Sequence, residues 1–279
     1  MKDRKGFYWF LLPSVVLFLF ATVYPFISGL NVAFTNWDGI SRDYDYIGFK
    51  NFIDMFHDSN IVRSIWVTLA FGIGYTLLNN VLSLSIAILL RPKFKGNAFI
   101  KTVFFIPMAL SPVLAAFVWG FIDRNILSNV LGSSLLGKPA TVLWGLIMIA
   151  LWSGIGSNIM VYLAGLTNIP NDYYEAAAID GVTVWQKFRY ITLPLLGPSF
   201  TTCITLTLTS ALREFGITMS ATAGGPARSS EMISIFIYKN LFSFQKAGYG
   251  QAVSLVFMMI LMVLGICMNR FFRSKEVEL

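Results

Sequence analysis

Residues 171–194 read NDYYEAAAIDGVTVWQKFRYITLP, and this hydrophilic stretch decides how the rest of the chain is interpreted. Asn171 is a favourable cap for a first short helix, and Gly181 can end that helix in the left-handed conformation that glycine tolerates best. Thr183 followed by Gln186 has the spacing of a capping box, which begins a second helix. The stretch therefore predicts a helix, a sharp bend and another helix, which together we call the knob.

The composition places the knob in a membrane protein. The chain is 56% apolar and 13% charged, with a mean hydropathy of +0.68, values typical of a polytopic membrane protein. Its net charge of +7 comes from short basic clusters beside apolar runs, where they set membrane orientation rather than bind nucleic acid. Cys203 and Cys267 lie inside apolar runs, and His57 is the only histidine. These residues predict neither a disulfide nor histidine-based metal or acid-base chemistry.

Six apolar segments are long enough to cross a bilayer. They cover about residues 7–34, 64–90, 99–122, 140–166, 195–219 and 251–272. Pro107 and Pro112 predict a kink in the third segment. These boundaries divide the chain into a first span with its external loop (1–63), a membrane core that contains the knob (64–272) and a short cytoplasmic tail (273–279).

The basic residues set the orientation of these spans. Arg91, Lys93, Lys95 and Lys101 lie in one short connection that contains no acid, so the positive-inside rule puts this connection in the cytoplasm. Six spans return the C-terminus to the side of the N-terminus. We therefore expect a multi-pass protein of the cell membrane whose two termini and knob are cytoplasmic.

The fixed positions of the knob resemble a family motif. Glu175-Ala176-Ala177, then Gly181, Ile191 and Leu193-Pro194 match the E-A-A-x3-G-x9-I-x-L-P loop of ABC-importer permeases at every fixed position. The wider chain is similar to carbohydrate-importer permeases through YIGFKNF at 46–52, TAGGP at 222–226, and Tyr238 before Gly248-Tyr249. The resemblance covers nearly the whole length.

This resemblance implies an all-α membrane protein with six transmembrane helices, the type I ABC importer permease fold, and a cytoplasmic coupling helix in the knob. It also implies a second, similar permease subunit, an ABC ATPase dimer that binds ATP and Mg²⁺, and an extracellular binding protein that delivers the carbohydrate. The chain itself would need no cofactor or metal. The residues that would couple it to the ATPase are Glu175, Ala176, Ala177, Gly181, Leu193 and Pro194.

Each of these coupling residues also has a purely structural interpretation. Glu175 could orient the knob or pair with a cation of the ATPase, or it could be a solvated charge favoured by the helix dipole. Ala176 and Ala177 could fit a partner groove by being small, or they could reflect helix propensity alone. Gly181 has a backbone role, because a Cβ is strained at positive φ.

The segment GSSLLGKP at 132–139 is the strongest signal for an enzyme, since it matches a phosphate-binding loop up to its last position. Pro139 stands where the loop needs a magnesium-binding hydroxyl, no strand precedes the segment, and the topology puts it outside the cell. The sequence has no paired-carboxylate, triad or metal-spaced cluster elsewhere. We therefore expect that the chain is not an enzyme and that a separate subunit hydrolyses ATP.

Polar residues inside two spans are candidates for the substrate path, because polar groups in lipid tend to face a cavity or another helix. They are Trp152, Gly154, Ser157 and Asn158 in the fourth span, and Thr207, Ala211, Arg213 and Glu214 in the fifth. Positions 207, 211 and 214 share one face of a continuous helix. Proteins bind sugars through aromatic rings and through amide or carboxylate oxygens. In the permeases that this chain resembles, these two spans contribute to the sugar site.

The same side chains could instead pack one helix against another, and Arg213 and Glu214 could pair with each other. Residues 222–226 form a turn-rich external segment, and 233–244 predict an amphipathic helix, which could meet the binding protein or cover the path. Two alternative functions remain open at this point. One is an importer for an anionic solute, such as an acidic sugar or glycerol phosphate, which Arg213 would favour. The other is a secondary transporter that needs no ATPase.

Overall fold

The computed structural model describes residues 4–92 and 94–274, and helices make up nearly all of its regular structure. The described chain forms two compact units, which we treat separately. Unit 1 holds residues 1–61 and 236–260, and unit 2 holds 62–235 and 261–279. Residues 275–279 of the predicted tail lie outside the described residues.

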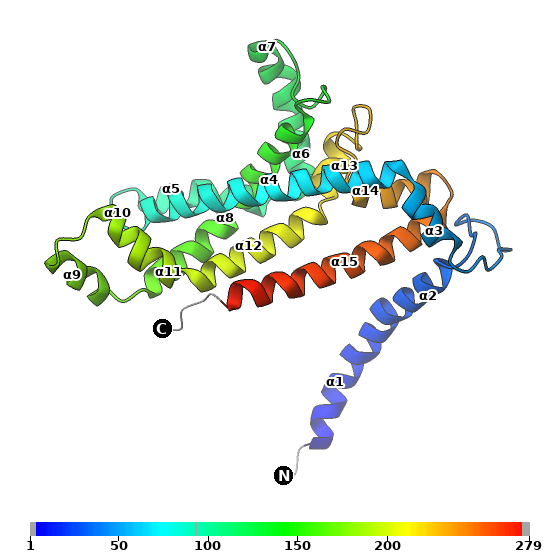
Figure 1. The fold of residues 1–279 in the computed structure, drawn as a ribbon, viewed down its shortest axis with the longest axis horizontal. Coiled ribbons are helices and arrows are strands. Elements are labelled where there is room, and N and C mark those ends of the chain that lie inside the picture. Colours follow the sequence, from blue (N-terminus) through cyan, green and yellow to red (C-terminus); the bar gives the residue numbers. More distant parts are fainter. Residues whose placement is uncertain (1–3, 93, 275–279) are drawn as a thin grey trace. The chain divides into compact units, whose positions relative to one another are not determined.

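The helices of both units follow in chain order (Figure 1). Unit 1 contains α1 (Arg4–Phe18), η1 (Leu19–Val23), α2 (Tyr24–Val32), α3 (Lys50–His57) and η5 (Lys239–Ser243). Three helices belong partly to each unit: α4 (Ser59–Leu90), α14 (Ile233–Tyr238) and α15 (Ala247–Arg273). Unit 2 contains α5 (Asn97–Phe105), η2 (Ile106–Ala109), α6 (Pro112–Ile122), η3 (Asp123–Leu127), α7 (Ser128–Leu131), α8 (Val142–Asn168), α9 (Asp172–Ile179), α10 (Val184–Lys187), η4 (Phe188–Thr192), α11 (Leu193–Leu195), α12 (Gly197–Leu212) and α13 (Gly216–Ala221).

The membrane spans agree with the six predicted segments when bent helices are counted as single spans. Within the described chain, four helical stretches are long and apolar enough to cross a bilayer: Trp9–Val32, Ser59–Leu90, Val142–Asn168 and Ala247–Arg273. Two bent pairs raise the number to six, and they are Asn97–Ala109 with Pro112–Leu131 and Val184–Leu195 with Gly197–Leu212. An all-helical membrane fold with up to six spans is therefore confirmed.

The third span differs from its prediction. We expected one helix kinked at its prolines, but the helix ends before Pro112 and the two halves are bent by 105°. Ser111 has an extended backbone, with φ −66° and ψ 150°, and its Oγ accepts a hydrogen bond from the backbone N–H of Leu114. The residue before a proline disfavours the helical conformation, and a capping serine restarts the helix, so the chain breaks here rather than kinks.

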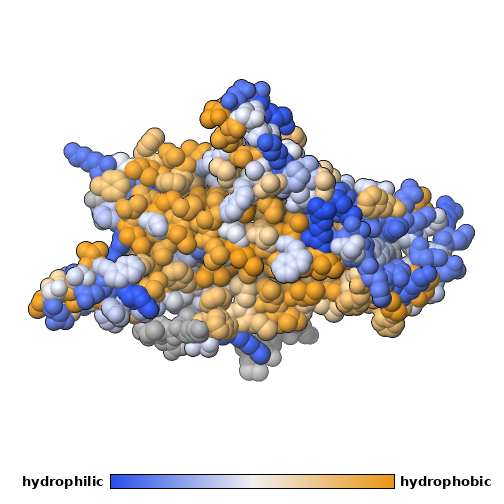
Figure 2. Space-filling model, turned by 45° about the horizontal axis from the view of Figure 1, so that its top comes forward, coloured by the Kyte–Doolittle hydropathy of each residue, from blue (hydrophilic) through white to orange (hydrophobic). Residues whose placement is uncertain are grey.

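The core of unit 2 includes two apolar clusters. One surrounds Phe71 and Leu146, and the other surrounds Ile159 and Tyr162 on the next turns of α8. Figure 2 shows a broad apolar surface on the visible face, and many large apolar side chains of the helices are exposed. An outer surface of this kind suits lipid, in which only helices with internally satisfied backbones can lie.

Unit 1 has a smaller core at the end of its first span. Ala33, Ala252 and Leu255 are buried there, with Phe34 and Phe52 packed against them. The hydrophobic stretch Trp9–Val32 is unburied along the window that identifies it as a span. Its apolar surface is therefore available to lipid or to another subunit.

The segment that resembles a phosphate loop does bind an anion, but the anion is a carboxylate of the protein itself. Asp123 is buried, and its two oxygens accept hydrogen bonds from the backbone N–H groups of Leu135 (2.8 Å) and Leu136 (3.3 Å). The hydroxyl of Ser134 also donates to Asp123. The donors of the loop at 132–139 thus fix it to the end of α6. This structural role explains why the loop resembles a phosphate-binding sequence, and it requires no nucleotide.

We predict that Asp123→Ala destabilises the protein by about 2–4 kcal/mol, because three donors lose a charged acceptor in a buried place. The control is Asp43→Ala, which removes an exposed carboxylate. Thermal unfolding of both variants in the same detergent would measure the difference. An Asp123→Ala protein that unfolds at the midpoint of the control would contradict this role for the loop.

Candidate functional site

The knob forms one end of unit 2 (Figure 1). It consists of α9, a bend, and a second helical stretch through α10, η4 and α11. Gly181 has φ +69° at the bend, and its N–H donates to the carbonyl of Ala178 at 3.3 Å. The N–H of Val182 reaches back to the carbonyl of Ala177 at 3.1 Å. This pair of bonds is a Schellman motif, so the predicted helix end at Gly181 is confirmed.

The start of the second helix is confirmed, and Asn171 does precede the first helix, but it lacks the expected side-chain cap. The N–H of Thr183 donates to Oε1 of Gln186 at 2.8 Å, and the N–H of Gln186 donates to Oγ1 of Thr183 at 3.3 Å, which completes the capping box. Asn171 makes no capping bond with its side chain. Its backbone is already helical, with φ −65° and ψ −25°, whereas a capping side chain works from an extended backbone.

The outward surface of the knob carries large apolar side chains. Ile179 is 88% exposed, Val184 85% and Trp185 69%. Ala176 faces outward with them, but Ala177 is buried, so only one of the two predicted small contact residues is on the surface. Exposed apolar patches of this kind are typical of interaction sites.

The remaining coupling candidates lie at different depths. Glu175 is exposed on α9, whereas Leu193 and Pro194 are half-buried in α11, where the knob joins the following span. The motif therefore combines residues of the outer surface with residues that form the base of the knob.

The base of the knob is fixed to the end of α4. The guanidinium carbon of Arg91 lies 4.5 Å from the centroid of the Tyr174 ring, within the range of a cation–π contact. The Tyr174 hydroxyl hydrogen-bonds Oγ1 of Thr192 at 3.0 Å. One tyrosine therefore joins α9, η4 and the basic connection that follows α4.

A buried set of polar side chains, which we call the polar cluster, joins three spans of unit 2. Nδ2 of Asn158 donates to Oδ1 of Asn79 at 2.6 Å and to Oγ1 of Thr207 at 2.8 Å. Oγ of Ser83 lies 3.2 Å from both Oδ1 of Asn79 and the carbonyl oxygen of Ile155, so its single proton is shared between these two acceptors. These bonds connect α4, α8 and α12, and α8 and α12 are the spans on either side of the knob.

Trp152 and Gly154 of α8 each contact a neighbouring helix, α6 and α4 respectively. The Trp152 ring packs edge-to-face on Trp119, with 6.2 Å between centroids, and Nε1 of Trp119 is buried without a hydrogen-bond partner in the described chain. Gly154 lets α4 approach α8, because a Cβ there would lie 2.2 Å from the hydroxyl of Tyr75. That hydroxyl accepts from Nδ2 of Asn79 at 3.2 Å.

Ser157 and Ala211, the other two candidates within the helices, do not join the polar cluster. Ser157 is exposed and donates to the carbonyl of Gly154 in its own helix at 2.8 Å. Ala211 is buried in the first apolar cluster of unit 2.

Arg213 and Glu214 lie beyond the end of α12. Glu214 is therefore not on the helix face where we expected it. Helix α12 ends at Leu212, so Glu214 lies beyond it in the connection to α13. Oε1 of Glu214 accepts from the N–H of Ile217 at 2.7 Å, and Nε of Arg213 donates to the carbonyl of Thr209 at 3.2 Å. Arg213 and Glu214 therefore do not pair with each other.

Residues of the second span were missed by the sequence analysis. Tyr75, Asn79 and Ser83 follow one another at four-residue intervals and face α8 through the contacts above. The adjacent asparagines at 79 and 80 within an apolar helix were the available signal, because amides are costly in lipid unless they find partners. Asn80 also has such a partner, since it accepts from the hydroxyl of Tyr162 at 2.7 Å.

Comparison with known proteins places these features in a family. Residues 79–274 match the model of the binding-protein-dependent transport system inner membrane component. The chain is 31% identical to the probable starch degradation products transport system permease protein AmyD of Thermoanaerobacterium thermosulfurigenes, over 98% of this chain and 96% of that protein. It is 28% identical to the multiple sugar-binding transport system permease protein MsmF of Streptococcus mutans, over 97% of each. It is 29% identical to the trehalose/maltose transport system permease protein MalF of Thermococcus litoralis, over 93% of this chain and 91% of that protein.

Solved structures show the same fold. A chain of a bacterial ABC transporter involved in the import of the acidic polysaccharide alginate superposes with a TM-score of 0.84 at 24% identity, over 98% of this chain and 96% of that chain. A chain of the inward-facing MetNI methionine ABC transporter gives 0.60 at 19% identity, over 78% and 96%. The chain therefore belongs to the inner membrane components of binding-protein-dependent transport systems: it is a multi-pass permease of an ABC importer, whose ATPase is a separate subunit.

Proposed function

We propose that this permease forms the transport path of an ATP-driven importer for a carbohydrate, a mono- or oligosaccharide that an extracellular binding protein delivers. The support for the substrate class is that nearly full-length relatives carry names of starch-product, multiple-sugar and trehalose/maltose systems. The observation that carries the proposal is that one span, α8, supplies both Trp152 and Asn158 of the polar cluster, because aromatic rings and polar side chains within a span are suited to a sugar path.

The proposed orientation puts both termini and the knob in the cytoplasm. The contact between Arg91 and Tyr174 supports this orientation, since it brings the basic connection and the knob to the same end of unit 2. Basic connections of this length are retained on the cytoplasmic side. The knob then faces the compartment that contains ATP.

In this proposal the knob is where the ATPase acts on the permease. Glu175, Ala176 and Gly181 present or shape the contact surface, and Ala177, Leu193 and Pro194 hold that surface on the spans. The ATPase would cover Ile179, Val184 and Trp185, which water solvates poorly. A second, similar permease and two copies of the ATPase complete the transporter, and closure of the ATPase dimer moves the knobs and rocks the spans.

The substrate path would run along α8 and α12. Trp152 supplies a ring face, Gly154 keeps the helices close, and Ser157 faces outward, toward the space that a second permease would border. The two helices are held against each other by the hydrogen bond between Asn158 and Thr207, and Ala211 packs in the apolar core. Arg213 and Glu214 follow the end of α12.

The proposal is tested with the complete importer in proteoliposomes, with ATP on the knob side and the binding protein on the other. We expect ATP-dependent uptake of one or more labelled sugars from a panel of maltose, trehalose, maltotriose and raffinose. Uptake only of glucuronate or glycerol phosphate would establish the anionic alternative. Uptake by this chain alone in an ion gradient would establish a secondary transporter. Either result would overturn the proposal.

We predict that Gly181→Val uncouples ATP hydrolysis from uptake, whereas Gly181→Asn retains coupling. No atom lies within 4 Å of a Cβ at this position, so the two variants differ in backbone strain alone. Asparagine tolerates positive φ, whereas the left-handed conformation costs an ordinary residue about 1–2 kcal/mol. The measurement is the number of ATP molecules hydrolysed per sugar imported. Equal ratios in the two variants would contradict a role for the bend in coupling.

We predict that Trp152→Ala lowers sugar uptake about tenfold or more, since loss of a stacked ring costs about 1–3 kcal/mol. Stimulation of the ATPase by the binding protein should persist. Trp144→Ala is the matched control, because Trp144 is on the same helix with an exposed ring. If both variants transport equally well, Trp152 does not line the path.

A further inference from the structure

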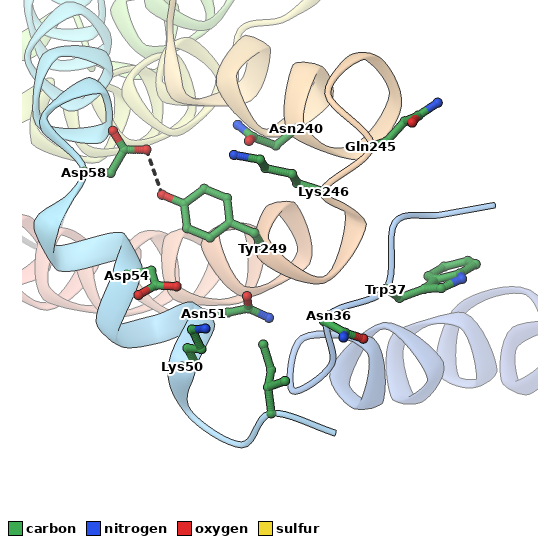
Figure 3. A pocket seen from close by; sticks show the side chains of 11 residues that line it. Asn36, Trp37, Lys50, Asn51, Asp54, Asp58, Asn240, Gln245, Lys246 and Tyr249 are labelled. Carbon is green, nitrogen blue, oxygen red and sulfur yellow. Dashed lines mark hydrogen bonds between the residues drawn. The ribbon is translucent and has the colours of Figure 1, made fainter. Parts of the chain in front are cut away.

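Unit 1 contains a cleft that neither the knob nor the path uses (Figure 3). Its volume is about 410 Å³, within the range of roughly 300–1,000 Å³ that is typical of small-molecule sites. The cleft lies between the loop that follows α2, helix α3, and the chain from η5 into α15. Four side-chain amides, two lysines, two aspartates, two aromatic rings and one isoleucine line it.

The walls of the cleft are held together by bonds within unit 1. Asn51, which is 6% exposed, donates from Nδ2 to the carbonyls of Ala33 and Thr35, both at 2.8 Å. Gly248 packs so closely on the same turn that a Cβ would lie 2.1 Å from the carbonyl oxygen of Thr35. Its N–H donates to the carbonyl of Trp37 at 2.9 Å. The cleft is therefore formed before anything binds in it.

The loop that carries Trp37 is also fixed locally. Both carboxylate oxygens of Asp38 are used, since they accept from the N–H groups of Ile40 and Ser41 at 2.8 Å and from the Ser41 hydroxyl at 2.6 Å. The hydroxyl bond, together with the backbone bonds, lowers the pKa of Asp38 to about 2. Asp38 therefore stays ionised throughout the physiological pH range.

Two buried amides offer acceptors that the protein leaves free. Asn240 is 4% exposed and donates from Nδ2 to the carbonyl of Phe236 at 2.9 Å. Neither its Oδ1 nor that of Asn51 accepts a hydrogen bond from any described residue. Although both residues are buried, these two oxygens keep some surface open to solvent. They are therefore acceptors that a ligand donating hydrogen bonds can reach in place of water.

Charged groups of both signs lie beside these amides. Among the described residues, the side chains of Lys50, Lys246 and Asp54 have neither an ion-pair nor a hydrogen-bond partner. Asp58 is held by the hydroxyl of Tyr249 at 2.9 Å, which also orients that ring in the cleft (Figure 3). Two lysines and two aspartates balance in charge, so the lining favours a neutral ligand that both donates and accepts.

The edge of the cleft has a strained backbone. Gln245 has φ +54°, a conformation that asparagine or glycine would adopt more readily. The N–H of the next residue, Lys246, donates to the carbonyl of Asn240 at 2.9 Å and holds the turn. Strain of this kind persists where surrounding contacts impose it, and it gathers at ligand sites.

We infer that this cleft binds a neutral saccharide on the outer side of the membrane, at a site separate from the path along α8 and α12. Sugar hydroxyls both donate and accept, which matches free amide oxygens beside free ammonium and carboxylate groups. The ring of Tyr249 offers an apolar face for sugar C–H groups. The inference rests on the proposed function for the sugar class and for the outward orientation of the loops. In the transporter, the site would hold a sugar on the outer side of the membrane after the binding protein opens.

The test is equilibrium binding of labelled maltose, trehalose, maltotriose and raffinose to the complete importer in nanodiscs, without binding protein or nucleotide. We expect saturable binding of an imported sugar, with affinity lowered roughly tenfold by Asp54→Ala and by Lys246→Ala, the effect of losing one hydrogen bond to a charged group. Asp43→Ala, a loop change outside the cleft, should bind as the wild type does.

Three results would overturn this inference. The wild type could bind no sugar of the panel, or the two cleft variants could bind as tightly as Asp43→Ala, which would leave water as the occupant. The variants could also raise the binding-protein concentration needed for ATPase stimulation while sugar binding is unchanged, and the cleft would then be a protein-docking site. ATP-dependent uptake by the wild-type importer in any of these cases would leave the proposed function intact.

Discussion

The two hydrogen bonds donated by Asn158 are the constraint on which unit 2 depends. In lipid an amide has no water to bind, so it must find partners on neighbouring helices. Asn158 finds one on α4 and one on α12, and by doing so it fixes the relative rotation of three spans. Because α8 leads into the knob and α12 leads out of it, both connections of the knob belong to one hydrogen-bonded set of helices. A force on the knob is therefore passed to two spans together.

The knob itself is held by local bonds and by one aromatic joint. Its bend closes within six residues through backbone hydrogen bonds around Gly181, and its second helix begins with a capping box. Tyr174 then connects both halves to the end of α4 through Arg91 and Thr192. A bent segment with a rigid base and an exposed apolar surface is well suited to transmit motion between subunits.

The sequence predicted the features that are determined by residues close together in the chain. The bend and the capping box could be identified because glycine and Thr-x-x-Gln act over a few residues, and the spans because lipid selects for apolar length. The polar cluster could not be identified, since Asn79 and Asn158 are brought together by packing across 79 positions. Two predictions failed for other reasons: Pro112, with the capping Ser111 before it, ended a helix that we expected to kink, and α12 ended at Leu212, so that Glu214 lies beyond the helix. The cleft of unit 1 is lined by segments about 200 residues apart in the chain, so no local sequence pattern could predict it.

The central claim is that ATP-driven motion enters the permease through the knob from the cytoplasm. Its most direct test is the reactivity of a cysteine introduced at Ile179, in a chain whose Cys203 and Cys267 are replaced, toward a membrane-impermeant maleimide. We expect labelling only in inside-out vesicles stripped of the ATPase, and protection when the ATPase is added back. Labelling in intact cells, or labelling that the bound ATPase does not diminish, would contradict it.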